Sequence, residues 1–215
     1  MSDLTALNSG SREAILNRLR AVQNDAPAVN FTPVPAPRPT PVSDLKTQFL
    51  QAALAGSSTV EEVAGRHEVP AAVQRYLEGE GLPKAAALWA EFRELDWASA
   101  GITVAVRAAN GDDAVGITGV GCAIAETGTL VVLSGPDTAA TTSLLPATHI
   151  AVVRLSSLVP GMEEALARIK TEQGALPRAV NLISGPSRTG DIEQTIVLGA
   201  HGPSRVHLIL VENDE

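Results

Sequence analysis

Glu126 is the acidic residue whose neighbours best suit it to chemistry. It follows the small apolar run GCAIA and precedes a turn formed by Thr127 and Gly128. A carboxyl group that is partly removed from water has a raised pKa, which suits acid–base or nucleophilic catalysis. The carboxylate can instead accept hydrogen bonds from the N–H groups of its own turn and hold the loop in place. Both interpretations of Glu126 stay open from the sequence.

Two further glycine-rich loops join this turn in the predicted binding region. Open α/β sheets bind ligands beyond the carboxyl ends of their strands, where loops present free backbone N–H groups. The loops at 125–129, 184–193 and 199–203 each adjoin a predicted strand. We predict that Glu126 acts at this site, and that a small anionic substrate is bound by loop residues. These residues are Thr127, Gly128, Thr129, Ser184, Gly185, Ser187, Arg188, Thr189, Asp191, Glu193 and His201.

The loop at 184–193 has the composition of an anion-binding segment. Its two glycines permit tight turns, its hydroxyl groups can donate, and Arg188 can bind a carboxylate or phosphate through two N–H groups. Its two acidic residues oppose that interpretation, and the segment matches neither the Walker nor the dinucleotide-binding pattern. The alternative is a helix N-terminus that is capped by Thr189 or Asp191.

Histidine and cysteine give no sign of a metal site. His149 and His207 open apolar strands, and His67 lies in a charged stretch that we expect to be exposed. His201 lies in a glycine-rich turn, where it either carries protons and contacts anions or completes the hydrogen bonds of the loop. No two histidines have a ligand spacing such as H-x-x-x-H, so we predict no metal site.

Cys122 is the single cysteine of the sequence and has small neighbours. One cysteine forms neither an internal disulfide nor a four-cysteine iron–sulfur cluster. We therefore predict a buried structural thiol and no cofactor bound by this chain.

The composition also limits the partners. The 215 residues carry 16 basic and 24 acidic side chains, a formal charge of −8, and we expect no nucleic-acid partner because this charge repels phosphate backbones. No stretch approaches the roughly 20 apolar residues that cross a bilayer, and the first residues lack the features of a secretory signal. We expect a cytoplasmic protein without membrane insertion.

The elements that must position the loops alternate between strand and helix. Helices are predicted at 45–54, 71–77, 138–145 and 162–169, and residues 60–64 are ambiguous. Strands are predicted at 85–92, 116–120, 129–133, 149–153, 180–183 and 206–211, and residues 102–106 form either a further strand or a helix end. Because several strands are apolar throughout, we predict an α/β domain at 43–215 in which helices cover both faces of an open sheet.

Residues 1–42 have a different character. Ser11 is a candidate N-cap, and Ile15, Leu16, Leu19 and Val22 recur at helical spacing. Six prolines between 27 and 41 exclude helix and central strand and favour an extended tether. We predict an N-terminal helix and a proline-rich arm at 1–42.

Several motifs together resemble the LUD-domain family. They are ITGVGCAIAETGTLVVL at 117–133, SGP at 134–136, LLP at 144–146, SGPSRTGDIEQTIVLGAHGP at 184–203 and VHLILVE at 206–212. SREAILNRLR at 11–20 is similar to the opening of the short family members that carry no iron–sulfur cluster. The resemblance implies a three-layer Rossmann-like open sheet of the NagB/RpiA/CoA-transferase type.

The resemblance also implies a context and an alternative. The context is a bacterial system that oxidises L-lactate to pyruvate, in which iron–sulfur partner proteins carry the clusters and this cluster-free chain has an accessory or substrate-handling role. The alternative comes from CoA-transferases of this fold, whose nucleophilic Glu stands in a Glu-small-Gly turn that Glu126-Thr127-Gly128 resembles. That similarity implies a stand-alone enzyme for an acyl-CoA, sugar-phosphate or folate-like substrate, although a fold alone does not determine function.

Overall fold

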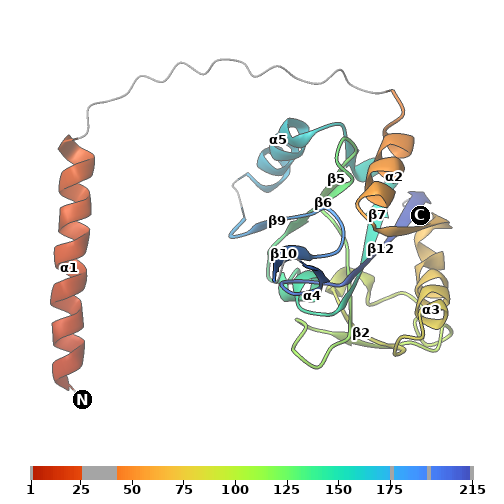
Figure 1. Ribbon diagram of the computed structural model, residues 1–215, viewed down its shortest axis with the longest axis horizontal. Coiled ribbons are helices and arrows are strands. Elements are labelled where there is room, and N and C mark those ends of the chain that lie inside the picture. Colours follow the sequence, from red (N-terminus) through yellow and green to blue (C-terminus); the bar gives the residue numbers. More distant parts are fainter. Residues whose placement is uncertain (1, 26–42, 175–176, 193–194, 214–215) are drawn as a thin grey trace. The chain divides into compact units, whose positions relative to one another are not determined.

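The computed structural model describes residues 2–25, 43–174, 177–192 and 195–213 (Figure 1). Its Cα positions divide the chain into two units, Met1–Thr40 and Pro41–Glu215. Among the described residues, one helix belongs to the first unit and every strand belongs to the second. No described helix is both long and apolar enough to cross a membrane.

Helix α1 of the first unit spans Ser2–Asp25. The predicted start at Ser11 is wrong, because this residue lies inside the helix, where its side chain is exposed. The residues before it include leucine and alanine, which favour helix, and Gly10 costs only about 1 kcal/mol inside one. The side chains of Ile15, Leu19 and Val22 are all exposed. The predicted proline-rich arm lies almost entirely outside the described residues.

The described part of the second unit is built on a six-stranded parallel sheet with the strand order β1-β12-β7-β4-β2-β3. Its strands are β1 (Thr59–Gly65), β2 (Ala85–Leu88), β3 (Thr103–Val106), β4 (Val115–Thr118), β7 (Thr148–Arg154) and β12 (Arg205–Asn213). This parallel sheet confirms the predicted α/β class. The ambiguous residues 60–64 belong to β1.

A four-stranded sheet with the order β8-β5-β6-β9 packs against this core in the described residues. Its strands are β5 (Cys122–Ile124), β6 (Thr129–Leu133), β8 (Leu158–Val159) and β9 (Val180–Ile183). Two of these strands, at 129–133 and 180–183, were predicted from the sequence, but their separate sheet was not. A short antiparallel pair, β10 (Arg188–Ile192) and β11 (Thr195–Leu198), follows.

Alternate residues of β6 serve two different cores. Leu130 and Val132 belong to the main core, whereas Val131 belongs to a smaller cluster with Ala165 and Ile169 of helix α5. Because successive strand residues point to opposite faces, a strand that is covered on both sides is apolar throughout. This double coverage explains the run TLVVL.

Helices lie against both sheets (Figure 1). The α-helices of the second unit are α2 (Leu45–Ala55), α3 (Val69–Gly79), α4 (Thr141–Leu144) and α5 (Met162–Gln173), and the 3-10 turns are η1 (Arg66–Glu68), η2 (Ala90–Phe92) and η3 (Leu155–Ser157). Helix α2 contacts both β1 and β8 and therefore links the two sheets.

The parallel sheet is covered on both faces, as predicted. Tyr76 of α3 stacks on His207 of β12 with 3.9 Å between the ring centroids. Gly116 of β4 points to the opposite face, as the register shows, and a Cβ there would overlap the Thr142 carbonyl of α4. Helices α3 and α4 therefore lie on opposite faces of the sheet.

The predicted strand at 85–92 is half wrong. Strand β2 ends at Leu88, and Ala90–Phe92 form a 3-10 turn. Trp89 and Phe92 are buried although they lie beyond the strand, and the indole N–H of Trp89 donates to the Ala139 carbonyl at 3.1 Å. The apolar run thus continues through a buried turn, so its length gives the wrong end for the strand.

Candidate functional site

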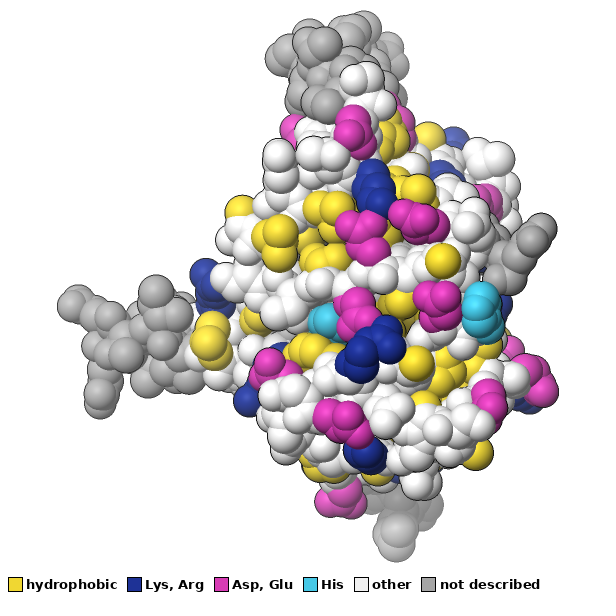
Figure 2. All heavy atoms as spheres, turned by 90° about the vertical axis from the view of Figure 1, so that its right-hand side faces the viewer, with side chains coloured by type: hydrophobic (Ala, Val, Ile, Leu, Met, Phe, Trp, Pro, Cys, Tyr) yellow, Lys and Arg dark blue, Asp and Glu magenta, His cyan; other side chains and the backbone are white. Residues whose placement is uncertain are grey.

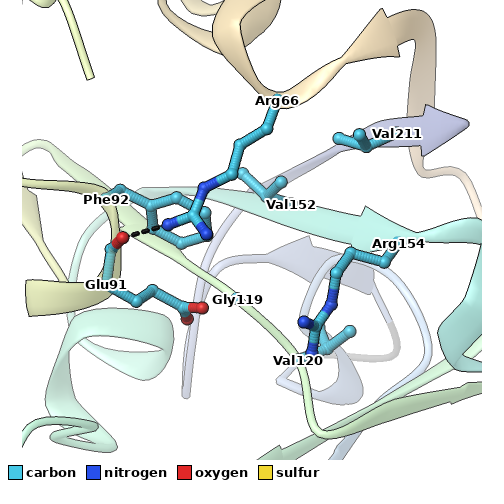
Figure 3. A pocket seen from close by; sticks show the side chains of 8 residues that line it. All are labelled: Arg66, Glu91, Phe92, Gly119, Val120, Val152, Arg154 and Val211. Carbon is cyan, nitrogen blue, oxygen red and sulfur yellow. Dashed lines mark hydrogen bonds between the residues drawn. The ribbon is translucent and has the colours of Figure 1, made fainter. Parts of the chain in front are cut away.

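All six strands of the parallel sheet end at one edge, and a cavity opens there (Figure 3). It encloses about 420 Å³ of empty space, its mouth included. The residues that line it are Arg66, Glu91, Phe92, Gly119, Val120, Val152, Arg154 and Val211. Several of these residues end a parallel strand or directly follow one, which is the usual ligand position in open α/β folds.

Arg66 follows β1 directly and opens η1. Its guanidinium group donates to the backbone carbonyl of Glu91, and its central carbon lies 5.0 Å from the centroid of the Phe92 ring. A guanidinium at this distance from an aromatic ring is attracted by the ring electrons. These two contacts hold the cation at one side of the cavity.

Arg154 is the last residue of β7 and stands in register with Val211 of β12. Its side chain is exposed and enters the cavity from a different side than that of Arg66, with its guanidinium group near Val120 (Figure 3). Strand β12 lies between β7 and β1 in the sheet. The two cations therefore come from strands on either side of β12.

Glu91 lies in the turn after β2, and its carboxylate accepts the backbone N–H of Gly119. The residue is exposed as a whole, but partial removal of its carboxylate from water raises the pKa of Glu91. The charges of Arg66 and Arg154 and the Gly119 hydrogen bond act in the opposite direction. The carboxylate can therefore accept a hydrogen bond, or donate one when it is protonated.

A second hollow continues from this cavity and shares Glu91 and Val120 with it. It is bordered by Trp89, Leu133 and Gln173 and by the loop at 134–138, whose first residues form the SGP motif. The Ser134 hydroxyl accepts the backbone N–H of Ala179 at 2.8 Å, which fixes the start of this loop.

The predicted loop at 125–129 joins the antiparallel strands β5 and β6. The side chain of Glu126 is exposed. Its backbone N–H donates to the Pro160 carbonyl at 3.1 Å. Gly128 has a φ of 64°, and a Cβ there would overlap the backbone of Ala52 and Ala53 in α2. The turn is thus fixed against α2, and the catalytic role of Glu126 stays a prediction.

The predicted loops do contact one another. The Thr129 hydroxyl lies 2.6 Å from that of Thr127 and 2.7 Å from that of Ser184, so three hydroxyl groups form a chain. Arg188 donates to the hydroxyl of Ser57. A Cβ on Gly185 would overlap the Gly56 carbonyl, so this loop packs closely against the residues after α2.

The loop at 199–203 meets the loop at 184–193 through backbone hydrogen bonds. Ser187 donates to the Pro203 carbonyl at 2.8 Å and accepts the N–H of Gly199 at 2.9 Å. His201 is exposed. The predicted helix cap is wrong, because Thr189 and Asp191 belong to strand β10. Glu193 lies outside the described residues.

Among the described residues, those that line the carboxyl-edge cavity come from segments other than the three predicted loops. The loop at 125–129 connects strands of the second sheet, and the loop at 199–203 precedes β12 at the opposite edge of the parallel sheet. The binding role of the three predicted loops therefore stays a prediction, separate from this cavity. Arg154 follows the predicted strand 149–153 directly, and this position is the signal that could have identified it.

The remaining predictions concern whether the side chains of the other histidines and of the cysteine are buried or exposed. His149 and His207 are buried, and loss of hydration lowers the pKa of each to about 4. His67 is exposed, as predicted. Cys122 is buried, and desolvation raises the pKa of its thiol. The prediction of a buried thiol is confirmed.

This architecture defines an open-sheet α/β protein with a small cavity at the carboxyl edge of its parallel strands. The chain belongs to the LUD-domain family, whose model matches residues 50–211. The fold is similar to that of a DUF162 family protein from Deinococcus radiodurans, with a TM-score of 0.58 and 24% identity over 78% of this chain and 96% of that one. That similarity supports the fold alone.

Curated relatives match a shorter segment. The chain is 40% identical over 102 residues to lactate utilization protein C of Bacillus licheniformis, and 43% identical over 102 residues to the protein of that name in Bacillus subtilis. It is 44% identical over 100 residues to lactate utilization protein C of a Geobacillus species. The matched segments span 45–46% of this chain and 42% of each relative, so the similarity covers less than half of those proteins.

Proposed function

We propose that this chain is a component of a bacterial L-lactate utilisation system in the cytoplasm. The observation that carries the proposal is the identity of about 40% to relatives named lactate utilization protein C. Membership of the LUD-domain family over residues 50–211 is consistent with it. The role we assign is accessory to the oxidation of L-lactate to pyruvate and includes handling of the substrate.

Electrons released by that oxidation pass to partner proteins that carry iron–sulfur clusters. The 215 residues contain one cysteine, which is buried against α5, whereas such clusters are held by several cysteine thiolates. The chain therefore acts beside the electron carriers in this proposal and binds no cofactor of its own.

The test is L-lactate-dependent dye reduction in extracts of a strain that lacks the gene, compared with the same strain carrying the wild-type gene. We expect the activity to be lost in the deletion strain and restored by the wild-type protein. NADH-dependent dye reduction in the same extracts controls for general damage to electron transfer. Full L-lactate activity without the gene, in a strain with no other lactate-oxidising enzyme, would show the proposal to be wrong.

A further inference from the structure

The second hollow lies at a topological switch point of the parallel sheet. Strands β2 and β4 are neighbours, but the chain continues from β2 to β3 at one edge of the sheet and from β4 to β7 on the other side. Open α/β sheets bind ligands in the crevice that such a reversal leaves outside the carboxyl ends of the strands. Trp89, directly after β2, and Val120, just after β4, border the hollow. Its volume of about 340 Å³ lies at the low end of the range for small-molecule pockets, roughly 300–1,000 Å³.

The charged side chains that border the second hollow are acidic. Its described lining includes the carboxylates of Glu91 and Asp137 and no lysine or arginine. Arg66 and Arg154 act on Glu91 from the adjoining cavity. The exposed carboxylate of Asp137, in contrast, forms no ion pair or hydrogen bond with a described residue. The formal charge of the whole chain, −8, has the same sign. A cleft of one sign concentrates small ions of the opposite sign, so the hollow favours a cation over an anion.

The walls of the second hollow suit an organic cation better than a bare metal ion. The side chains that give it apolar surface are Trp89, Val120, Leu133 and Pro136. Hard metal ions need several oxygen ligands, and the described part of the chain holds no group of three His, Cys, Asp or Glu side chains that could bind a metal. A carbon body that covers these walls removes apolar surface from water, which favours binding. A small organic cation therefore matches both the carboxylates and the walls.

Asp137 lies in a turn that is closed before any ligand binds. The backbone N–H groups of Gly135 and Thr138 each donate to the carbonyl of the other residue at 3.3 Å. The indole N–H of Trp89 donates to the carbonyl of Ala139, the residue after this turn, at 3.1 Å. The apolar wall and the turn that carries the carboxylate are thus joined. A site whose backbone is already ordered loses less conformational entropy on binding.

We propose that the second hollow binds a small primary amine, whose ammonium group pairs with the Asp137 carboxylate and whose carbon body lies against the apolar walls. A primary amine is protonated at pH 7, and its three N–H donors allow a further bond to a second acceptor such as Glu91. The ligand has the opposite charge to lactate, so this site does not rest on the proposed function. It is also separate from the loop residues around Glu126.

The test is an NMR titration of the full chain with phenethylamine, and with phenethyl alcohol as the matched neutral probe. The chain has two tryptophans, and only Trp89 borders the hollow. We expect the amine to shift the indole N–H signal of Trp89. The signal of Trp97, which is buried and donates to the Phe92 carbonyl, should stay almost unchanged. The amine should bind about fivefold more tightly than the alcohol at low salt, and added salt should reduce this ratio.

Asp137→Asn removes the proposed partner of the ammonium group. It should weaken the binding of phenethylamine about fivefold and leave that of phenethyl alcohol unchanged. Asp112→Asn is the matched control, because Asp112 is an exposed aspartate that borders neither the cavity nor the second hollow. It changes the total charge equally and should leave both affinities unchanged. Thermal unfolding of each variant shows whether it folds, and Asp137→Ser carries the test if Asp137→Asn does not fold.

Three outcomes would overturn the inference. They are equal affinities for the amine and the alcohol, an amine affinity that Asp137→Asn leaves unchanged or that Asp112→Asn weakens equally, and equal shifts of the two indole signals, which would indicate binding over the surface in general. Absence of amine binding gives the first of these outcomes. Selective amine binding that requires Asp137 would support the site, whether or not the deletion strain oxidises L-lactate.

Discussion

The position of the Glu91 carboxylate depends on Gly119, a residue without a side chain. A Cβ on Gly119 would overlap the carboxylate of Glu91. We predict that Gly119→Ala displaces this carboxylate with little change in melting temperature, because the displaced group is the exposed end of a flexible side chain. Gly121→Ala is the control, since the atoms nearest to its Cβ would belong to the Leu133 side chain and the Val131 carbonyl. Thermal unfolding of both variants measures this, and a clearly lower melting temperature for Gly119→Ala than for Gly121→Ala would contradict the prediction.

The two buried histidines predict that acidification destabilises the fold. The Thr118 hydroxyl lies 2.8 Å from Nε2 of His149, and the Thr59 hydroxyl lies 2.8 Å from Nδ1 of His207. Burial lowers the pKa of each ring from 6.5 to about 4. Between these values the unfolded chain binds more protons than the folded chain, so the free energy of unfolding falls as the pH falls. The expected loss is about 1.4 kcal/mol per histidine between pH 7.5 and 5.5.

Urea unfolding at several pH values between 7.5 and 5.5 measures this loss. His207→Phe removes one titrating ring and keeps an aromatic face for Tyr76, so about half of the pH dependence should remain. His67→Gln should leave the dependence unchanged, because His67 is exposed. A free energy of unfolding that stays constant across this range would be incompatible with two neutral buried rings.

The sequence can place single residues of the site when they follow a clear strand. Arg154 follows the predicted strand 149–153 directly, and its location at the carboxyl edge could be derived from that alone. Arg66 could not be found in this way, because β1 was ambiguous and the Phe92 ring that positions its guanidinium lies 26 residues further along the chain. Glu91 lies within residues 85–92, an apolar run that was predicted to be a strand over its whole length.

At the scale of elements, local sequence patterns predicted most helices and strands. They did not predict where these elements end or which strands share a sheet. Helix α5 was predicted at 162–169 and extends to Gln173, where Gly174 with a φ of 68° ends it. The run TLVVL has the pattern of a buried parallel strand, yet β6 pairs antiparallel with β5 and β9 in the second sheet. An apolar strand indicates that both of its faces are buried. Several sheet arrangements, parallel and antiparallel, can bury both faces of a strand.

Replacing Gly128, in the turn between β5 and β6, should cost an unusual amount of stability. We expect Gly128→Ala to destabilise the chain by about 3 kcal/mol, because a left-handed conformation costs an alanine about 1–2 kcal/mol and the overlap with α2 adds overpacking. Gly81→Ala is the matched control, since Gly81 has nearly the same φ, 63°, and nothing within 4 Å of a Cβ. It should cost about 1–2 kcal/mol. Equal losses in urea unfolding would show that α2 does not press on the turn.

At the scale of the whole molecule, charges of both signs lie close together on the face drawn in Figure 2. The ion pairs of the chain include Lys46 with Glu62 and Glu212, and Arg75 with Glu61. Exposed pairs of this kind contribute little to stability, typically less than about 1 kcal/mol. The stability of the fold therefore has to come from its apolar core, whose described residues lie within Pro41–Glu215.

This distribution predicts that residues 1–40 add almost nothing to the stability of the rest. The described apolar side chains of α1, such as Ile15 and Leu19, are 63% and 58% exposed, and an isolated helix is marginal in water. We expect a chain that starts at Pro41 to have a urea midpoint close to that of the full chain, with a difference in the free energy of unfolding of at most about 0.5 kcal/mol.

Phe49→Ala in both chains provides the comparison, because Phe49 of α2 is completely buried and its loss should cost about 3–5 kcal/mol. If the shorter chain loses as much stability as Phe49→Ala, residues 1–40 contribute to the folded core after all. If its midpoint is unchanged, α1 is available for a role outside the core, which lactate-dependent dye reduction by the shortened chain in the deletion strain then measures.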